Sequence, residues 1–302
     1  MENSITAQII ADSSNSKGCR LTTFILRFPR IVLAEYNTHR AFSRNSSSSR
    51  AIPFEKMLEM VKSDPFIPIA FQKDHKGMQG VEYFEESDLD ICVSDWLKAR
   101  DAAVTAATGF RLPVTKQLRN RLLEPFMWQT VIMTATDFQN FFSLRAHKDA
   151  EIHIEALAYK MLEEYNKSEP KKLLAGEWHI PFGDKIDADR IFKTQAWQKE
   201  TEGMALNMSG DMNYYLDLFK CKIAISRCAR VSYLNFEGKD DYEADIKLCD
   251  RLFGSTPRHL SPTEHVAQCV DDNKYIGNFQ GFKQYRYMFK DQNSEDNRVL
   301  KK

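Results

Sequence analysis

The sequence predicts an α+β fold in which a twisted antiparallel sheet is flanked by helices. Residues 21–28 (LTTFILRF) are rich in β-branched and aromatic side chains, which favours a strand. Residues 149–165 instead repeat apolar side chains at helical spacing, so these fall on one face of a helix. Residues 204–230 form a second helix-like run. Strand and helix patterns in separate stretches are typical of a sheet with helices packed against it.

Composition narrows the class of protein before any motif is considered. The 302 residues suffice for a buried core, and hydrophobic residues make up 43%. Lys+Arg and Asp+Glu both number 42, so a phosphate-binding site must come from a local cluster. No secretory signal and no membrane-spanning apolar run is visible. The 6 cysteines lie far apart without a CxxC pair, which argues against a zinc site or a disulfide scaffold and favours a reducing, cytoplasmic location.

The first region, residues 1–165, carries most of the regular pattern. Pro29 follows the predicted strand and can open a helix that continues over residues 31–40. Residues 51–98 contain several prolines and glycines and are predicted to be loop-rich, with helices resuming near their end. Asp149 stands where the N-cap of the next helix is expected.

A connector and a second region complete the chain. The connector, residues 166–204, is polar and lysine-rich around the sequence EWHIP. The second region, residues 205–302, continues the helix-like run and then contains RHLSPTEHVAQC and NFQGFKQYRYMF. Its last dozen residues are predicted to form a solvated tail.

The most informative stretch is HRAFSRNSSSSR, which runs from His39 to Arg50. Arginine makes bidentate, charge-assisted hydrogen bonds and serine supplies short donors, so the stretch suits a phosphate or the edge of a pyrimidine. A serine-rich run is also typical of a flexible linker. Its position directly after a patterned strand, proline and helix favours a binding loop.

A second cluster of basic residues lies further along the first region. It comprises Arg119, Arg121 and Arg145. Arg145 precedes the predicted N-terminus of the helix over residues 149–165, where a bound anion would be stabilised by the helix dipole. The alternative is that these arginines are solvated surface residues.

The segment HLSPTEH, residues 259–265, has the pattern of a helix start. Ser261 would be the N-cap, Pro262 the first helical residue and Glu264 the third, which together form a capping box. Two histidines flanking a glutamate could also indicate a metal. The spacing is not HExxH and a proline interrupts it, so we predict no metal site.

Together these clusters resemble the flavin-dependent thymidylate synthases. The family signature is RHRxxSxNxxSxR, and residues 38–50 (THRAFSRNSSSSR) match it at every fixed position except the first. In the family, as here, a strand, a proline and a helix lead into the signature. The match therefore includes the predicted elements that precede the motif as well as the residues of the motif itself.

Four further segments extend the resemblance. Residues 121–125 (RLLEP) and 144–145 (LR) are similar to the family's other arginine motifs. Residues 229–233 (ARVSY) and 259–265 look like its ARVS and HxSPFEH motifs. In the standard family the last two precede the signature, whereas here they follow it, so the order of motifs is circularly permuted. The resemblance implies a flavin-dependent thymidylate synthase-like fold in which both regions form one intertwined catalytic domain.

The resemblance also implies roles for individual residues. The substrate, dUMP, would be bound by Arg50, Arg121, Arg145, Ser48, Ser49 and Glu35. Ser48 and Arg145 would also be catalytic. FAD would be bound by His39, Arg40, Asn45, Asn140, Ser232, His259, Ser261 and Glu264.

The reaction implied by the resemblance is the reductive methylation of dUMP at C5 to dTMP. Reduced FAD mediates transfer of the methylene group of methylenetetrahydrofolate, and NADPH reduces the flavin again. The implied protein is a homo-oligomer, a dimer or tetramer. It acts on a small pyrimidine deoxynucleotide and binds neither nucleic acid nor a membrane.

Departures from the family keep two alternatives open. Thr38 replaces an arginine, Ser46 a glutamate, Ala51 a tyrosine and Glu35 a glutamine. A glutamate beside a pyrimidine accepts where glutamine donates, which could favour a cytosine amino group. One alternative is therefore a flavin-dependent hydroxymethylase acting on dUMP or dCMP. The other is a non-catalytic protein that binds a nucleotide or nucleic acid through the serine- and arginine-rich loop.

Overall fold

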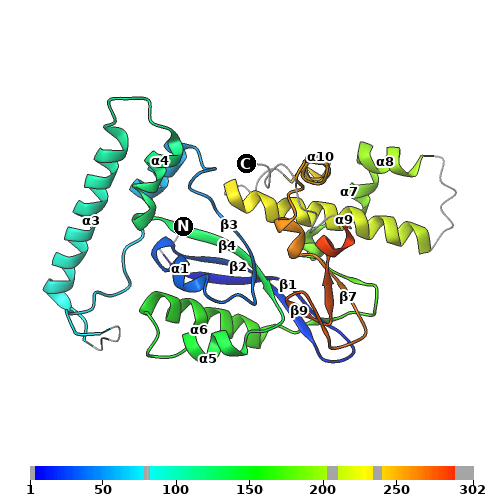
Figure 1. Ribbon diagram of the computed structural model, residues 1–302, viewed down its shortest axis with the longest axis horizontal. Coiled ribbons are helices and arrows are strands. Elements are labelled where there is room, and N and C mark those ends of the chain that lie inside the picture. The colour runs from blue at the N-terminus through cyan, green and yellow to red at the C-terminus, as the bar shows by residue number, and fades with distance from the viewer. Residues whose placement is uncertain (1–3, 78–79, 81, 203–209, 234–239, 290–302) are drawn as a thin grey trace, which may run out of the picture.

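A five-stranded sheet organises the computed structural model, which describes residues 4–77, 80, 82–202, 210–233 and 240–289 (Figure 1). Its strand order is β3–β4–β2–β1–β5. The strands are β1 (Thr6–Ser14), β2 (Arg20–Pro29), β3 (Ser43–Ser46), β4 (Trp128–Ala135) and β5 (Lys171–Lys172). The first four pair antiparallel, and β5 runs parallel to β1. The predicted α+β class and the strand over residues 21–28 are confirmed.

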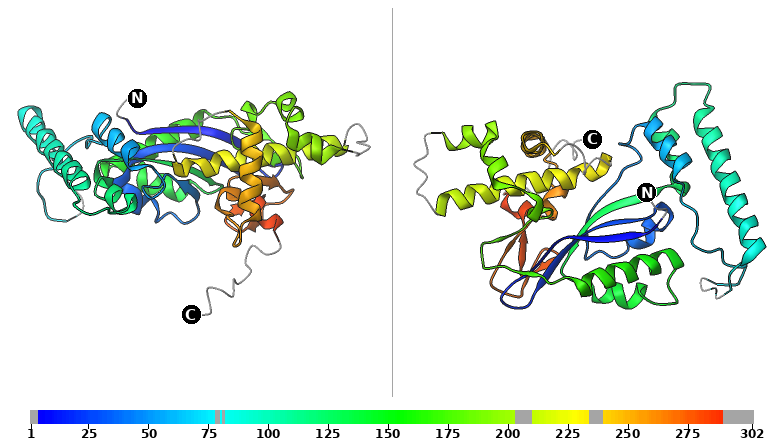
Figure 2. Two further views of the ribbon diagram at one scale, coloured as in Figure 1. Left: turned by 90° about the horizontal axis from the view of Figure 1, so that it is seen from above. Right: turned by 180° about the vertical axis from the view of Figure 1, so that it is seen from behind.

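The helices surround this sheet. In chain order they are α1 (Leu33–Tyr36), α2 (Phe54–Ser63), α3 (Glu86–Thr108), α4 (Lys116–Arg121), α5 (Gln139–Arg145), α6 (Ile152–Lys167), α7 (Ala188–Phe192), α8 (Gln195–Thr201), α9 (Gly210–Arg230) and α10 (Tyr242–Gly254). Figure 2 shows α3 and α4 at one end of the molecule and α7 to α9 at the other, with the sheet between them. Within the described residues, no helix is long and apolar enough to cross a membrane.

Short strands and 3₁₀ turns complete the structure, most of them in the second half of the chain. A three-stranded sheet joins β6 (Trp178–His179), β7 (Ala267–Cys269) and β10 (Phe282–Gln284), and β8 (Tyr275–Ile276) pairs with β9 (Phe279–Gln280). The 3₁₀ turns are η1 (Arg30–Val32), η2 (Glu124–Phe126), η3 (Gly183–Lys185), η4 (Val231–Tyr233), η5 (Ser261–Glu264) and η6 (Tyr285–Met288). The connector is thus more regular than its polar composition suggested. The expected tail lies outside the described residues.

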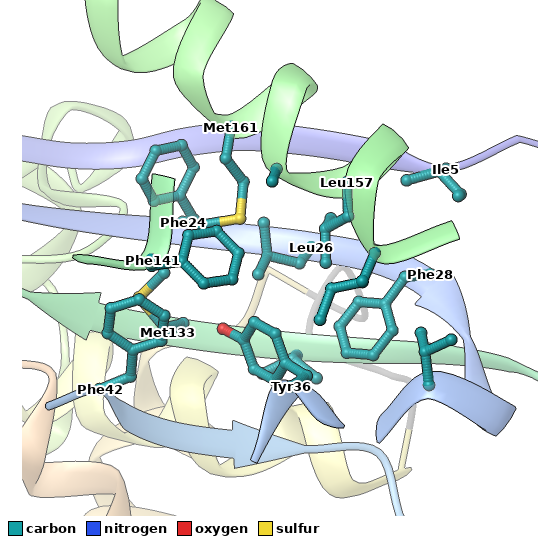
Figure 3. Close-up of a cluster of buried hydrophobic side chains, with 14 of the residues drawn as sticks. Ile5, Phe24, Leu26, Phe28, Tyr36, Phe42, Met133, Phe141, Leu157 and Met161 are labelled. Carbon is teal, nitrogen blue, oxygen red and sulfur yellow. The ribbon is translucent and has the colours of Figure 1, made fainter. Parts of the chain in front are cut away.

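The main core lies on one face of the sheet. Successive side chains of a strand point to opposite faces, so alternate residues of β2 and β4 face α5 and α6. The cluster includes Phe24, Leu26, Phe28, Met133, Phe141, Leu157 and Met161 (Figure 3). Tyr36 of α1 and Phe42 close it beside β3.

The opposite face is covered by the second half of the chain. Ile132 of β4 contacts Cys228 and Val231, at the end of α9 and the start of η4. Two threonines of the same face, Thr23 and Thr134, are cross-strand partners and are fully buried. This face is therefore part apolar and part polar.

Two predicted helices begin or end elsewhere. The helix expected over residues 31–40 ends at Tyr36, because Thr38 Oγ1 and the Thr38 N–H both donate to the Glu35 carbonyl and turn the chain. The N-cap expected at Asp149 is Glu151, whose carboxylate accepts from the backbone N–H groups of residues 153 and 154 at 2.9 and 3.1 Å. Glutamate can cap when its side chain folds back.

The loop-rich interpretation of residues 51–98 is only partly right. Pro53 precedes α2, and α3 begins at Glu86, ten residues before the expected restart near Trp96. A proline ahead of a helix is as typical of a helix start as of a loop. Counting prolines and glycines without their positions therefore underestimated the helical content of this segment.

Candidate functional site

The serine-rich run is an ordered loop that continues the edge of the sheet. Beyond β3, the Ser47 N–H donates to the Thr130 carbonyl at 2.8 Å. The Ser47 hydroxyl accepts from the Thr130 N–H at 3.2 Å, and the Gln129 amide donates to the Ser47 carbonyl at 2.8 Å. Ser47 is buried. These bonds support the prediction of a structured loop over the alternative of a linker.

The loop then makes a tight turn that α4 holds in place. The Ser48 carbonyl accepts from the N–H groups of Ala51 and Ile52. The fully buried amide of Asn120, on α4, donates to the carbonyls of Ser49 and Ile52 at 2.6 and 2.9 Å. The segment RLLEP is therefore brought to the signature loop, although the buried residue that joins them is the asparagine before it.

Ser49 lies in the scaffold of the loop. Its side chain is buried and donates to the carboxylate of Glu124, which also pairs with Arg30 at 3.4 Å. Arg30 in turn donates to the Gln129 side chain at 2.8 Å. The hydroxyl that the sequence assigned to substrate is thus already bonded within the chain.

Arg50 and Arg121 are both exposed. Arg50 follows the buried Ser49, and Arg121 follows the buried Asn120. In the part of the chain that the structure describes, neither guanidinium has a hydrogen bond or an ion pair. Both groups are therefore available to an anionic ligand.

Arg145 and His39 form a separate group at the other end of β3. The Arg145 Nε–H donates to His39 Nε2 at 3.0 Å, so the proton of the neutral imidazole is on Nδ1. The His39 ring stacks on Phe42 and meets Phe141 edge-on at 4.9 Å. Burial, together with the nearby charges of Arg145 and Arg44, lowers the pKa of His39 to about 4. His39 is therefore neutral near pH 7.

The structure does not gather the three predicted arginines into one cluster. The four residues of β3 span about 13 Å of extended chain and separate the His39 group from Ser48 and Arg50. Arg145 also ends α5 and does not directly precede the next helix, which begins at Ile152. Its charge therefore lies at the negative end of a helix dipole. Three other predicted residues, Glu35, Arg40 and Asn140, are exposed.

The two motifs of the second region meet the loop on the covered face of the sheet. The Ser48 N–H donates to the Ser232 carbonyl at 3.1 Å. The Asn45 and Ser261 side chains are hydrogen-bonded at 3.2 Å, although 216 positions separate them in sequence. The fold thus brings Ser232 and Ser261 to the signature loop, and whether they share a binding site with it stays a prediction. His259 is exposed, and its N–H donates to the Leu252 carbonyl at 3.2 Å.

The predicted capping box at Ser261 is wrong. Residues 261–264 form only a 3₁₀ turn, its N-cap is Leu260 and no side chain caps it. The Ser261 hydroxyl is bonded to Asn45, and the Glu264 carboxylate pairs with Arg286. Both side chains that would have closed the box have partners elsewhere in the fold.

Four residues to which the sequence analysis gave no role in binding substrate or cofactor help to hold the loop. Arg44 donates to the carbonyls of Tyr36 and His39, each at 3.3 Å. Asn278 and Gln284 donate to the Ser43 hydroxyl at 3.1 and 2.9 Å, and His265 contacts Asn45 at 3.0 Å. Arg44 lies within the signature and His265 ends HLSPTEH, where it was considered only as a metal ligand, whereas Asn278 and Gln284 belong to no motif.

Comparison with known proteins adds little to this site. No protein-family model matches the chain, and no curated protein matches it in sequence. Two structures of the UMP/dUMP methylase PolB from Streptomyces cacaoi partly resemble it. The one bound with 5-Br UMP is 16% identical with a TM-score of 0.45, over 55% of this chain and 90% of that chain. The one bound with 5-Br dUMP is 15% identical with a TM-score of 0.43, over 54% and 91%. Overlap at this level does not establish a shared activity.

Proposed function

We propose that the chain is a flavin-dependent transferase that methylates dUMP at C5 to give dTMP. Methylenetetrahydrofolate would donate the one-carbon group and NADPH would supply the reducing equivalents. The observation that carries the proposal is the meeting of three sequence motifs at one edge of the sheet. The signature loop is bonded to Ser232 through Ser48 and to Ser261 through Asn45. These are motifs in which the sequence resembles the flavin-dependent thymidylate synthases.

The turn of the loop supports binding of a nucleoside monophosphate. Arg50 lies in it and Arg121 lies on the helix that holds it, both exposed. A guanidinium binds a phosphate through two parallel hydrogen bonds. Ser48 adds a hydroxyl on a backbone that is held by hydrogen bonds from Ala51 and to Ser232. Because Glu124 is already paired with Arg30, its charge offsets the arginines of the turn only in part.

The other end of β3 has a donor set that fits FAD. Neutral His39 keeps its Nδ1–H as a donor beside two aromatic rings, and Arg40 is exposed next to it in sequence. In our proposal His39 orients the flavin ring and Arg40 binds its phosphates. When bound, FAD supplies the redox chemistry that no side chain provides. The role of this chain is to orient the reactants and to polarise the uracil with preorganised donors.

The separation of the arginines supports a homo-oligomer. Arg145 is held by His39, at the end of β3 opposite to Arg50. If both arginines bind the same group of one nucleotide, a second copy of the chain must supply one of them. We propose a dimer or tetramer in which the loop of one copy faces the His39 group of another.

Two measurements on the purified protein test the proposal. A flavoprotein absorbs at about 450 nm or acquires this band on reconstitution with FAD. Incubation with dUMP, methylenetetrahydrofolate and NADPH should then give dTMP, identified by its mass. Colourless protein that FAD does not reconstitute would refute flavin dependence and favour a non-catalytic nucleotide-binding protein.

A matched pair of arginine variants locates the nucleotide. Arg50→Gln should lower kcat/KM for dUMP by about 10- to 100-fold, since it removes charged hydrogen bonds to the phosphate. Arg111→Gln removes an equally exposed arginine outside the loop and should leave kcat/KM unchanged. Equal losses in the two variants would exclude the loop as the phosphate site.

A second candidate is hydroxymethyl transfer to dUMP or dCMP. Ser46 and Ala51, both small, border the ordered turn where the resembled family carries larger side chains. Space there would admit water in place of hydride. The same incubations separate the two reactions, because a product with the mass of a hydroxymethyl nucleotide would replace dTMP.

A further inference from the structure

A continuous chain of hydrogen-bonded side chains crosses the sheet beneath the candidate site. Its members, in order, are Ser13, His179, Thr23, Thr134, His265 and Asn45. The successive contacts measure 2.9, 2.8, 2.8, 2.8 and 3.0 Å. All members except Asn45 are buried. Asn45 ends the chain at the signature loop, and Ser13 ends it at a cavity of about 270 Å³.

The hydrogen bonds of this side-chain series must all run in one direction, from donor to acceptor. Burial lowers the pKa of His179 to about 4 and that of His265 to about 3, so both rings are neutral near pH 7. A neutral imidazole has one donor and one acceptor nitrogen, and each hydroxyl has one hydrogen. A hydroxyl can accept two hydrogen bonds, but within the described residues the Thr23 and Thr134 hydroxyls contact only other members of this chain. If each of their hydrogens is also to be bonded, all of the donors must point the same way along the chain.

Asn45 selects that direction. With its amide nitrogen facing inward, Asn45 donates to the Ser261 carbonyl and to His265 Nε2, both at 3.0 Å, and its Oδ1 accepts from the Ser261 hydroxyl at 3.2 Å. The reverse orientation would place Oδ1 against the Ser261 carbonyl, which is also an acceptor.

The remaining protons follow from this choice. His265 donates from Nδ1 to Thr134, Thr134 donates to Thr23, and Thr23 donates to His179 Nε2. His179 then donates from Nδ1 to Ser13. Both histidines are thus Nδ1–H tautomers, and each buried donor in the chain has an acceptor.

We propose that this chain positions the Asn45 amide so that it offers an acceptor, Oδ1, to a ligand with a ring N–H. An amide has nearly the same shape in its two orientations, so shape alone would not discriminate between them. A cyclic imide has the required donor, and it occurs both in uracil and in the flavin ring. His265, Thr134, Thr23 and His179 are positioning residues that act through Asn45. The proposed function enters only in the identity of the ligand.

The first test needs neither a ligand nor a variant. Long-range ¹H–¹⁵N spectra of protein labelled with ¹⁵N in its histidines should show His179 and His265 as Nδ1–H tautomers that do not titrate between about pH 5 and 8. Either residue found as the Nε2–H tautomer would overturn the direction of the chain and with it the proposal. This outcome is independent of whether dUMP or FAD binds.

The second test uses adjacent threonines on opposite faces of one strand. Thr23→Val removes the link between Thr134 and His179. Thr22→Val removes an equally buried hydroxyl, which is bonded to Asp12 at 2.9 Å. Only Thr23→Val should give a second His265 signal, of the Nε2–H form, because Thr134 can then turn and donate to His265.

Ligand affinity should follow the tautomer. Thr23→Val should weaken binding of dUMP or of FAD about fivefold, roughly 1 kcal/mol, whereas Thr22→Val should not. If only the affinity for dUMP falls, uracil is the partner of Asn45. If only the affinity for FAD falls, the flavin ring is its partner. The proposal would be overturned if the two variants weakened binding equally. It would also be overturned if neither variant changed the affinity for dUMP or for FAD. If wild-type protein binds neither ligand, the proposed function fails and the tautomers still decide the orientation of Asn45.

Discussion

The two faces of the five-stranded sheet come from the same strands but are held together differently. On one face, Phe24 and its neighbours pack against α5 and α6 in a continuous apolar cluster. On the other, Thr23 takes part in a chain of hydrogen bonds between the sheet and the second half of the molecule. Apolar packing has no direction, whereas a hydrogen bond has a donor and an acceptor. The first face therefore contributes mainly stability, and the second adds orientation to the residues at its edge.

The largest expected effect comes from a cavity on the apolar face. Phe24→Ala should lower the free energy of unfolding by about 3–5 kcal/mol, because it removes a fully buried ring from between β2 and the helices. Urea denaturation measures this loss. The His265 tautomer of the folded protein should remain unchanged, and a change would show that the two faces are coupled.

Acid should act on the polar face. The pKa values of His179 and His265 in the folded protein, about 4 and about 3, lie below the ordinary value of 6.5 that the unfolded chain regains. Stability from these groups is therefore complete above pH 6.5 and is lost as the pH falls toward 4. Two protons taken up on unfolding correspond to about 2.7 kcal/mol per pH unit. Denaturation at several pH values measures the slope, to which His39, with a pKa of about 4, also contributes. His179→Gln should lower the slope by about 1.4 kcal/mol per pH unit, the share of one proton.

Thr134→Val breaks the polar chain at its centre. The change leaves the His265 Nδ1–H and the Thr23 hydroxyl without their partner inside the protein, at a cost of about 2 kcal/mol. The loss should appear in urea denaturation with an unchanged dependence on denaturant. Unaltered stability would mean that these polar groups find other partners and that the hydrogen-bonded series does not act cooperatively.

The smallest loss of stability is expected at Ser13, the end of the hydrogen-bonded series that lies farthest from Asn45. Ser13→Ala should cost only about 0.5–1 kcal/mol, because Ser13 lines the cavity and water there can accept from His179. A loss as large as that of Thr134→Val, measured in the same way, would contradict the idea that this end is accessible to solvent.

The sequence predicted the features that depend on neighbours in the chain. The strand over residues 21–28 and the apolar face of α6 follow from local alternation and helical spacing, and both are confirmed. The meeting of the signature with Ser232 and Ser261 followed from the resemblance and is supported by the hydrogen bonds found. Whether these residues bind FAD and dUMP stays a prediction.

What could not be predicted depends on partners far apart in sequence. Ser49 was assigned to substrate because serine commonly donates to phosphate, yet it donates to Glu124, 75 positions away. Ser261 and Glu264 fitted a capping box but are bonded to Asn45 and Arg286. A local motif shows what a side chain is able to do. The fold determines which of the available partners it meets.

The joining of Asn45 to Ser261 also affects how the protein folds. Contacts between distant positions require closure of a long loop, which slows their formation, whereas local contacts form early. The sheet and α6 draw mainly on the first 167 residues, but the signature loop has partners as late as Gln284. We therefore expect the signature loop to reach its final conformation late in folding, when the second half of the chain docks. Its hydrogen-bond partners would then be the last to become protected from hydrogen exchange.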